Sequence, residues 1–280
     1  MEKQRTNLLF SLFKGALIGT GAILPGVSGG VLCVALGVYR PMMALLAHPI
    51  RELKARPGFF AALILGFLLG VLGLSRLVDW LFRASPVPAV WLFIGLIVGT
   101  MPSLWREAGR EGRSGSSWAA GGVAFALMLA FLLTLKKAGG MQVEPSVWTW
   151  LLCGVLWGIG LIAPGLSPSS LFIFMGVYQP MAAGIADLSL PLLLPMGAGL
   201  LLCVLTLSHG VSWLLKHCYA PVMHAILGVS LASTVMIVPL DAVGGWTNAL
   251  LYALCFGIGL MTALWMDRMN DKMEAAGQKT

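Results

Sequence analysis

The sequence predicts an all-α polytopic membrane protein built as an inverted-topology repeat. The chain has 280 residues, of which 58% are hydrophobic and only 10% charged, and ordinary soluble domains do not have this composition. Long apolar runs are separated by charged or Pro/Gly-rich stretches, and one motif-bearing stretch occurs twice, at residues 14–42 and 153–181. We expect each half of the chain to form a re-entrant helical hairpin followed by three transmembrane helices.

The first half, residues 1–140, begins with a hairpin expected over residues 11–47. Its first arm is shorter than the roughly 20 residues that a membrane-spanning helix needs. Pro25 and Gly26 should end this arm, since proline lacks the backbone N–H and glycine relaxes the backbone, and Ser28 is a suitable N-cap for the second arm. Two full spans also remain compatible with the lengths. The three later spans are expected at about 59–82, 90–104 and 118–135.

The second half, residues 141–280, repeats this plan with a hairpin over 148–183 that breaks at Pro164 and Gly165. The two hairpins align without a gap at an offset of 139, which is Pro164 minus Pro25. The identical pairs are Gly15/Gly154, Gly19/Gly158, Gly21/Gly160, Pro25/Pro164, Gly26/Gly165, Ser28/Ser167, Gly37/Gly176, Val38/Val177, Tyr39/Tyr178 and Pro41/Pro180. The three later spans are expected at about 191–215, 222–240 and 246–266.

The duplication continues into the spans at an offset of 133, which is Gly199 minus Gly66. The pairs at this offset are Gly66/Gly199, Ser75/Ser208, Trp80/Trp213, Pro88/Pro221 and Gly95/Gly228. Because one hairpin plus three spans crosses the membrane an odd number of times, the second half must be inverted relative to the first. Inverted repeats with broken helices are typical of secondary transporters, whose substrate site lies near the midplane at the repeat interface.

The basic residues predict that both termini are cytoplasmic. With that orientation the external segments hold only Arg83, Lys136 and Lys137, and the remaining Lys and Arg residues of the loops and termini are cytoplasmic. This asymmetry follows the positive-inside rule. The net charge of +7 is therefore explained by topology, and we expect no binding to nucleic acid.

The tip of each hairpin is the candidate binding site. A helix that begins there presents free backbone N–H groups and the positive end of its dipole, both of which favour an anion such as phosphate. Glycines allow a close approach to the backbone, and serines add hydroxyl groups. The predicted phosphate-binding residues at the tips are Ser28, Gly29, Gly30, Ser167, Ser169 and Ser170. The alternative is that the glycines and prolines only allow the turns and that the serines are ordinary N-caps.

Arg76 and His209 correspond at the offset of 133 and lie inside predicted spans. Ionisable residues at such positions are functional candidates, so we include both in the substrate site, with Arg76 as counter-charge. The alternatives are that Arg76 pairs with Asp79 and extends to the membrane surface, and that His209 is a satisfied polar group. Tyr39 and Tyr178 are interpreted as interfacial caps of the hairpins.

Two other function classes fit parts of the sequence. Residues 26–29 match the G-x-S-G pattern of intramembrane rhomboid-type serine proteases, whose nucleophile needs a base within hydrogen-bonding reach. The second copy, residues 165–168, has proline in place of the last glycine, so a structural role explains both copies better than a hydrolase does. A transporter or channel for a small soluble anion could use the same helix ends. No metal-ligand spacing or phosphate-cradling loop is present in the sequence, and we expect no enzyme activity, metal or cofactor.

The doubled P-G-x-S and G-V-Y-x-P pattern resembles the bacterial polyprenyl-phosphate transporter family, over about residues 14–266. Residues 25–30 match the family's first motif and residues 163–169 the second, with a departure at Pro168, where a small residue often stands. The resemblance implies a flippase of the cytoplasmic membrane that works by alternating access. It would return undecaprenyl phosphate, the lipid carrier of cell-wall and envelope polymer synthesis, from the outer to the inner leaflet. Its partners would be this lipid phosphate and the surrounding membrane lipids.

Overall fold

The computed structural model of the chain describes residues 8–24, 32–33, 36–38, 41–42, 44–45, 49–137, 143–162, 168–242 and 244–277. In these residues all regular secondary structure is helical, as the sequence predicts. Six of the described helices are long and apolar enough to cross a membrane. They are α5 (Pro57–Ala84), α6 (Pro86–Ala108), α7 (Gly115–Lys137), α11 (Leu190–His217), α12 (Tyr219–Met236) and α13 (Trp246–Gly277). The chain is therefore a multi-pass membrane protein.

The spanning helices match the predicted spans, with differences at their ends. Helices α5 and α6 begin a few residues early, each with a proline in its first turn, where the missing N–H would have no partner in the helix. Helix α12 ends at Met236 and not at the predicted residue 240. Pro239 explains this, because the residue before a proline is biased away from helical geometry, and a short 3-10 helix over Leu240–Ala242 follows.

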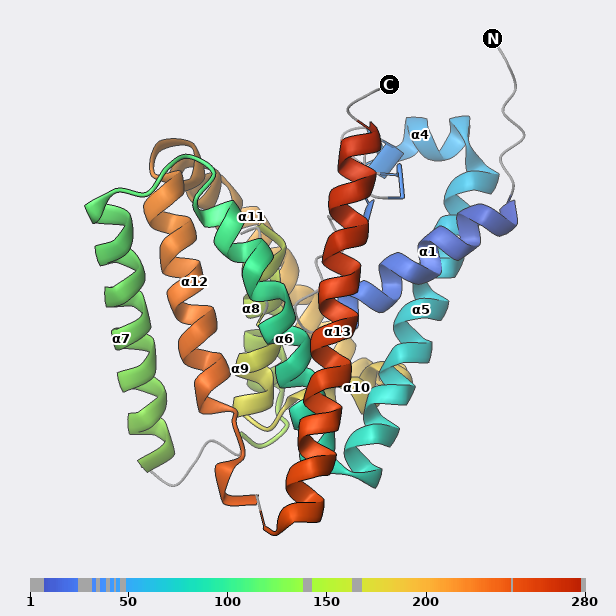
Figure 1. Cartoon of the computed structure of the whole chain (residues 1–280). Helices are drawn as coiled ribbons and strands as arrows, with labels where there is room; N and C mark the ends of the chain where they lie inside the picture. The colour runs from blue at the N-terminus through green and yellow to red at the C-terminus, as the bar shows by residue number, and fades with distance from the viewer. Residues whose placement is uncertain are drawn as a thin grey trace.

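Two apolar helices are too short to cross a membrane. Helices α1 (Leu8–Ile23) and α8 (Val147–Ile162) have 16 residues each, which gives about 24 Å of helix against a hydrocarbon core of about 30 Å. Shorter helices in the described part of the chain include α4 (Pro49–Ala55), α9 (Ser169–Phe174) and α10 (Tyr178–Ala186). The predicted breaks at Pro25, Gly26, Pro164 and Gly165 lie outside the described residues. The start of α1 and the end of α13 lie toward the same end of the molecule (Figure 1).

Helix α1 packs on α5 through direct backbone contact. A Cβ atom added to Gly15 would collide with the carbonyl oxygen of Leu63, and one added to Gly66 would collide with that of Leu12. Only glycine allows the two helices to come this close, as in other membrane proteins whose interfaces are built from small residues. These glycines therefore fix where the short helix lies along the spanning one.

Helix α8 packs on α11 through the equivalent residues of the second half. A Cβ atom added to Gly154 would collide with the carbonyl oxygen of Met196, and one added to Gly199 with that of Leu151. Gly154 is Gly15 plus 139, and Met196 is Leu63 plus 133. The offsets found in the sequence thus also relate the backbone contacts of the two helix pairs.

The last helix of each half packs on the middle spanning helix of the other half. Helix α13 lies along α6, and α7 lies along α12 (Figure 1). Both contacts again depend on glycine, because a Cβ atom on Gly95 would collide with the Phe256 oxygen and one on Gly228 with the Gly121 oxygen. Each half of the chain therefore contributes one helix, α7 or α13, that packs against the other half.

Gly66→Ala is expected to lower the free energy of unfolding by about 1–3 kcal/mol, the usual cost of overpacking, because the new methyl group would push α1 away from α5. Gly73→Ala is the matched control in the same helix, where an added Cβ atom has no neighbour within 4 Å. Thermal unfolding of the detergent-solubilised protein measures both. Equal melting temperatures for the two variants would contradict this packing.

Candidate functional site

The structure describes the surroundings of the predicted hairpin tips. Ser28, Gly29, Gly30 and Ser167 lie outside the described residues. The backbone of His209 lies in α11, but its side chain is outside the description as well. The described parts of the candidate site are the buried end of α1 and the segment from Ser169 to Gln179, together with the helices that these contact.

Ser169 and Ser170 are the first two residues of α9, after Pro168 at its N-cap position. The Ser170 side chain is buried, and its hydroxyl oxygen lies 2.8 Å from that of Ser233 on α12. Ser233 also donates a hydrogen bond to the Ser230 carbonyl oxygen, at 3.1 Å. Since a hydroxyl has one proton, Ser170 donates to Ser233.

A cluster of buried hydroxyl groups therefore lies where α9 meets α12. Its members are Ser170, Ser230, Ser233 and Thr234, which are between 1% and 8% exposed. Thr234 donates to the Ser230 carbonyl oxygen at 2.6 Å. In this arrangement the Ser170 hydroxyl donates its proton within the protein. Ser170 could donate a hydrogen bond to a phosphate group only if its hydrogen bond to Ser233 were broken.

Helix α6 carries a hydroxyl at the position equivalent to Ser233. Thr100 is Ser233 minus 133, and it donates to the Ile97 carbonyl oxygen at 2.8 Å, three residues earlier, just as Ser233 donates to Ser230. Sequence reasoning missed both residues. The available signal was a pair of hydroxyl side chains at the established offset inside two predicted spans.

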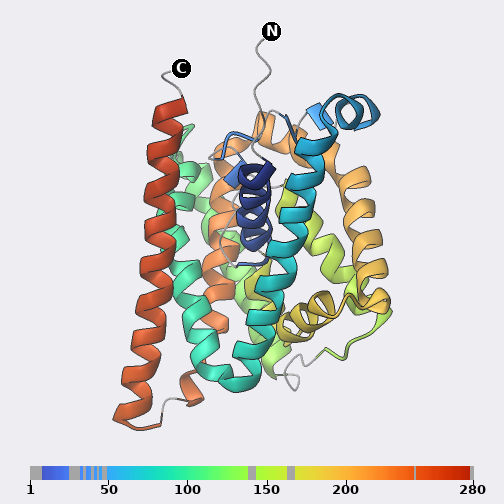
Figure 2. The same cartoon turned by 90° about the vertical axis from the view of Figure 1, so that its right-hand side faces the viewer.

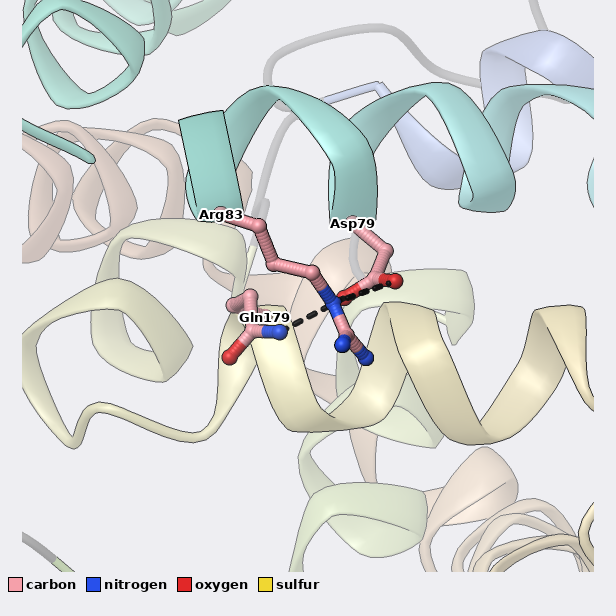
Figure 3. Close-up of polar contacts among 3 residues, drawn as sticks. All are labelled: Asp79, Arg83 and Gln179. Atoms are coloured by element: carbon pink, nitrogen blue, oxygen red, sulfur yellow. Dashed lines mark hydrogen bonds and ion pairs between the residues drawn. The ribbon is translucent and has the colours of Figure 1, made fainter. Parts of the chain in front are cut away.

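Arg76 has an exposed side chain on α5 and makes no hydrogen bond or ion pair within the part of the chain that the structure describes. The alternative pairing of Arg76 with Asp79 is wrong. Asp79 instead accepts hydrogen bonds from Arg83 Nε, at 2.9 Å to each carboxylate oxygen, and from Gln179 Nε2, at 2.6 Å. Figure 3 shows Gln179 reaching from α10 to this carboxylate on α5.

Tyr178 is not an interfacial cap, because its side chain is only 1% exposed. Its ring packs against both Phe82 and Phe93, with centroid distances of 5.9 and 5.4 Å. Its hydroxyl donates to the carbonyl oxygen of Ile23 at 2.7 Å. Ile23 is the last residue of α1, so this carbonyl has no partner within the helix. A side chain at the start of α10 thus satisfies the buried end of α1.

Among the described residues, no group of three or more His, Cys, Asp or Glu side chains is arranged to hold a metal ion. The described side chains offer a ligand the hydroxyl groups of α9 and α12, and Arg76 adds an exposed positive charge on α5. Hydroxyl and guanidinium groups bind an oxyanion by hydrogen bonding and charge.

Comparison with known proteins identifies related chains. A family model described as undecaprenyl phosphate translocase-like matches residues 1–114 and 55–251. A polyprenyl-phosphate transporter of Vibrio cholerae is 25% identical over 262 residues, which cover 88% of this chain and 82% of the relative. A polyprenyl-phosphate transporter of Staphylococcus aureus is 25% identical over 280 residues, covering 94% and 98%. No solved structure matches the chain.

Ser233→Ala is expected to destabilise the protein by about 1–3 kcal/mol, because it leaves the Ser170 hydroxyl buried without an acceptor. The further change Ser170→Ala in that background should cost much less than it does in the wild type. A double-mutant cycle on the free energy of unfolding measures this coupling. Additive effects would mean that the two hydroxyls do not interact.

Proposed function

Because the chain belongs to the undecaprenyl phosphate translocase-like family, we propose that it transports undecaprenyl phosphate across the bacterial cytoplasmic membrane. The lipid is returned from the outer to the inner leaflet for reuse in cell-wall and envelope polymer synthesis. The names of the two relatives, both polyprenyl-phosphate transporters, support this substrate. The step is a movement of the lipid without covalent chemistry, so the protein acts as a flippase and not as an enzyme.

The free-energy barrier to transport comes from the head group. A tail of 55 carbons, at about 0.8 kcal/mol per buried CH₂, contributes on the order of 40 kcal/mol of membrane affinity, so it stays in the lipid throughout. The phosphate is charged and cannot cross hydrocarbon without polar partners. The protein therefore has to supply a polar path for the head while the tail trails outside.

The observation that carries the proposal is the pair of short helices, α1 and α8, each held along a spanning helix by equivalent glycine contacts. We interpret each as the first arm of a re-entrant hairpin, and the two halves as inverted repeats. The matching offsets in Gly15/Leu63 and Gly154/Met196 support the repeat. The start of α1 and the end of α13 lie toward the same end of the molecule (Figure 1). This supports an even number of crossings with both termini on one side, which the basic residues assign to the cytoplasm.

In this proposal the phosphate binds at the hairpin tips. The serines and glycines predicted there, with Ser169 and Ser170, donate hydrogen bonds to the phosphate oxygens. The buried hydroxyl cluster gives Ser170 an internal partner, Ser233, which the phosphate replaces when it binds. Thr100 on α6 is the equivalent of Ser233 on α12. His209 remains a candidate substrate contact.

Arg76 has a distinct role in the proposal. Its exposed place on a spanning helix suits a counter-charge that meets the phosphate as the lipid enters from the side. A positive charge on that surface attracts lipid phosphate and extends toward the head-group region.

The serine pair at the tips gives the sharpest test of this site. Ser28→Ala/Ser167→Ala should reduce leaflet exchange of undecaprenyl phosphate in proteoliposomes to nearly that of empty vesicles, because each hairpin then loses a hydroxyl donor. Ser114→Ala/Ser116→Ala changes two exposed serines that hydrogen-bond each other near the start of α7, and should exchange like the wild type. Wild-type exchange by the first double variant would remove the tips from the site.

Arg76→Gln is expected to slow exchange and to raise the lipid concentration needed for half-maximal rate, because the positive charge at the entrance is lost. The matched control is Arg51→Gln, which removes a charge from the short helix α4. Both proteins should melt at the wild-type temperature. Equal exchange rates for the two variants would exclude Arg76 from the path.

A further inference from the structure

Two side chains at the start of α10 bind to the first half of the chain. Tyr178 donates to the Ile23 carbonyl at the end of α1, at 2.7 Å, and Gln179 donates to the Asp79 carboxylate of α5, at 2.6 Å. We call these two hydrogen bonds the α10 latch. Because α10 follows α8 and α9 in the second half, the latch joins the two halves of the chain (Figure 3).

A buried apolar cluster surrounds the Tyr178 half of the latch, whereas Gln179 and Asp79 are half-buried. Tyr178 belongs to the largest group of mutually packed buried side chains, which draws on both halves of the chain. Its members include Ile23 of α1, Val78 of α5, Phe93 of α6 and Cys153 of α8. Helix α10 lies toward the end of the molecule opposite to the C-terminal end of α13 (Figure 2). The cluster therefore lies where α10 meets the buried end of α1.

A phosphate head group cannot pass through such a cluster while it stays packed, since moving a charge into an apolar interior is strongly unfavourable. Transport between leaflets requires the site to open to each side in turn. The cluster beside α10 is packed in this structure, so α10 has to move away from α1 and α5 if the head group is to pass on that side.

The geometry points to Tyr178 and Gln179 as positioning residues that close one of the two access routes: we propose that the α10 latch forms when this side is shut and breaks when it opens. The inference deepens the proposed function and rests on it. The chemistry suits a reversible closure, because the Asp79 carboxylate keeps Arg83 as a partner when Gln179 leaves. The Ile23 carbonyl loses only one hydrogen bond, which water entering the opened route can replace.

Tethering the latch tests the proposal. In a Cys218→Ser background, which removes the exposed native thiol, Asp79→Cys and Gln179→Cys are combined and bridged by a short bifunctional methanethiosulfonate. Exchange of undecaprenyl phosphate in proteoliposomes should fall to the level of empty vesicles, and a reductant that cleaves the bridge should restore it. Leu77→Cys/Trp80→Cys, at two exposed positions of α5, is the matched control, and its bridge should leave exchange unchanged. Full exchange by the bridged latch would overturn the proposal.

A second measurement needs no transport and so separates the latch from the substrate. Tyr178→Phe should raise the rate at which a small thiol reagent labels the buried Cys153 by about tenfold, the factor expected for one lost hydrogen bond. Labelling of Cys203, buried outside this cluster, should not change. Tyr252→Phe, which removes a hydroxyl bonded to the Ala242 carbonyl, should change neither rate.

Parallel acceleration at both cysteines would indicate general loosening and would contradict the latch, as would no acceleration at Cys153. The wild type could also fail to exchange the lipid while Tyr178→Phe still exposes Cys153 selectively. That result would contradict the proposed substrate but would support the α10 latch.

Discussion

Hydrocarbon offers no hydrogen-bond partner to a peptide group, so a helix that ends inside a membrane protein must find its partners in the protein. In the proposed hairpins, helices α1 and α8, at 16 residues each, are subject to this constraint. Tyr178 meets it at Ile23, the last residue of α1. The glycine contacts hold one face of each short helix against a spanning helix, while Leu9 of α1 and Trp148 of α8 remain exposed, at 77% each.

The exchange of outer helices limits how the protein can move. Helix α13 lies along α6, and α7 lies along α12, each in backbone contact at a glycine. A motion that rocks one half of the chain as a rigid body would have to break both contacts. We infer that alternating access is carried by the proposed hairpins, which move against an interlocked frame of spanning helices. The latch on α10 lies at the boundary between these two parts.

The glycine contacts between helices were not predicted. The spans and the repeated residues could be predicted, because apolar runs and repeats are visible in the sequence itself. The contacts between halves could not. Tyr178 and Ile23 are 155 residues apart, and a tyrosine after an apolar arm has the same local sequence whether it is buried or interfacial. The alternative in which Arg76 pairs with Asp79 rested on helical spacing, but Arg83 has an equally suitable spacing, and Gln179 reaches Asp79 from another helix. The partner of Ser170 likewise depends on how α9 meets α12.

The most direct test of the account compares a lipid phosphate with a soluble one in the same vesicles. Purified wild-type protein in proteoliposomes is assayed for leaflet exchange of undecaprenyl phosphate and for flux of inorganic phosphate, with empty vesicles as reference. The account predicts lipid exchange well above the reference and no flux of the soluble ion. Phosphate flux without lipid exchange would contradict it and would favour a transporter or channel for small anions.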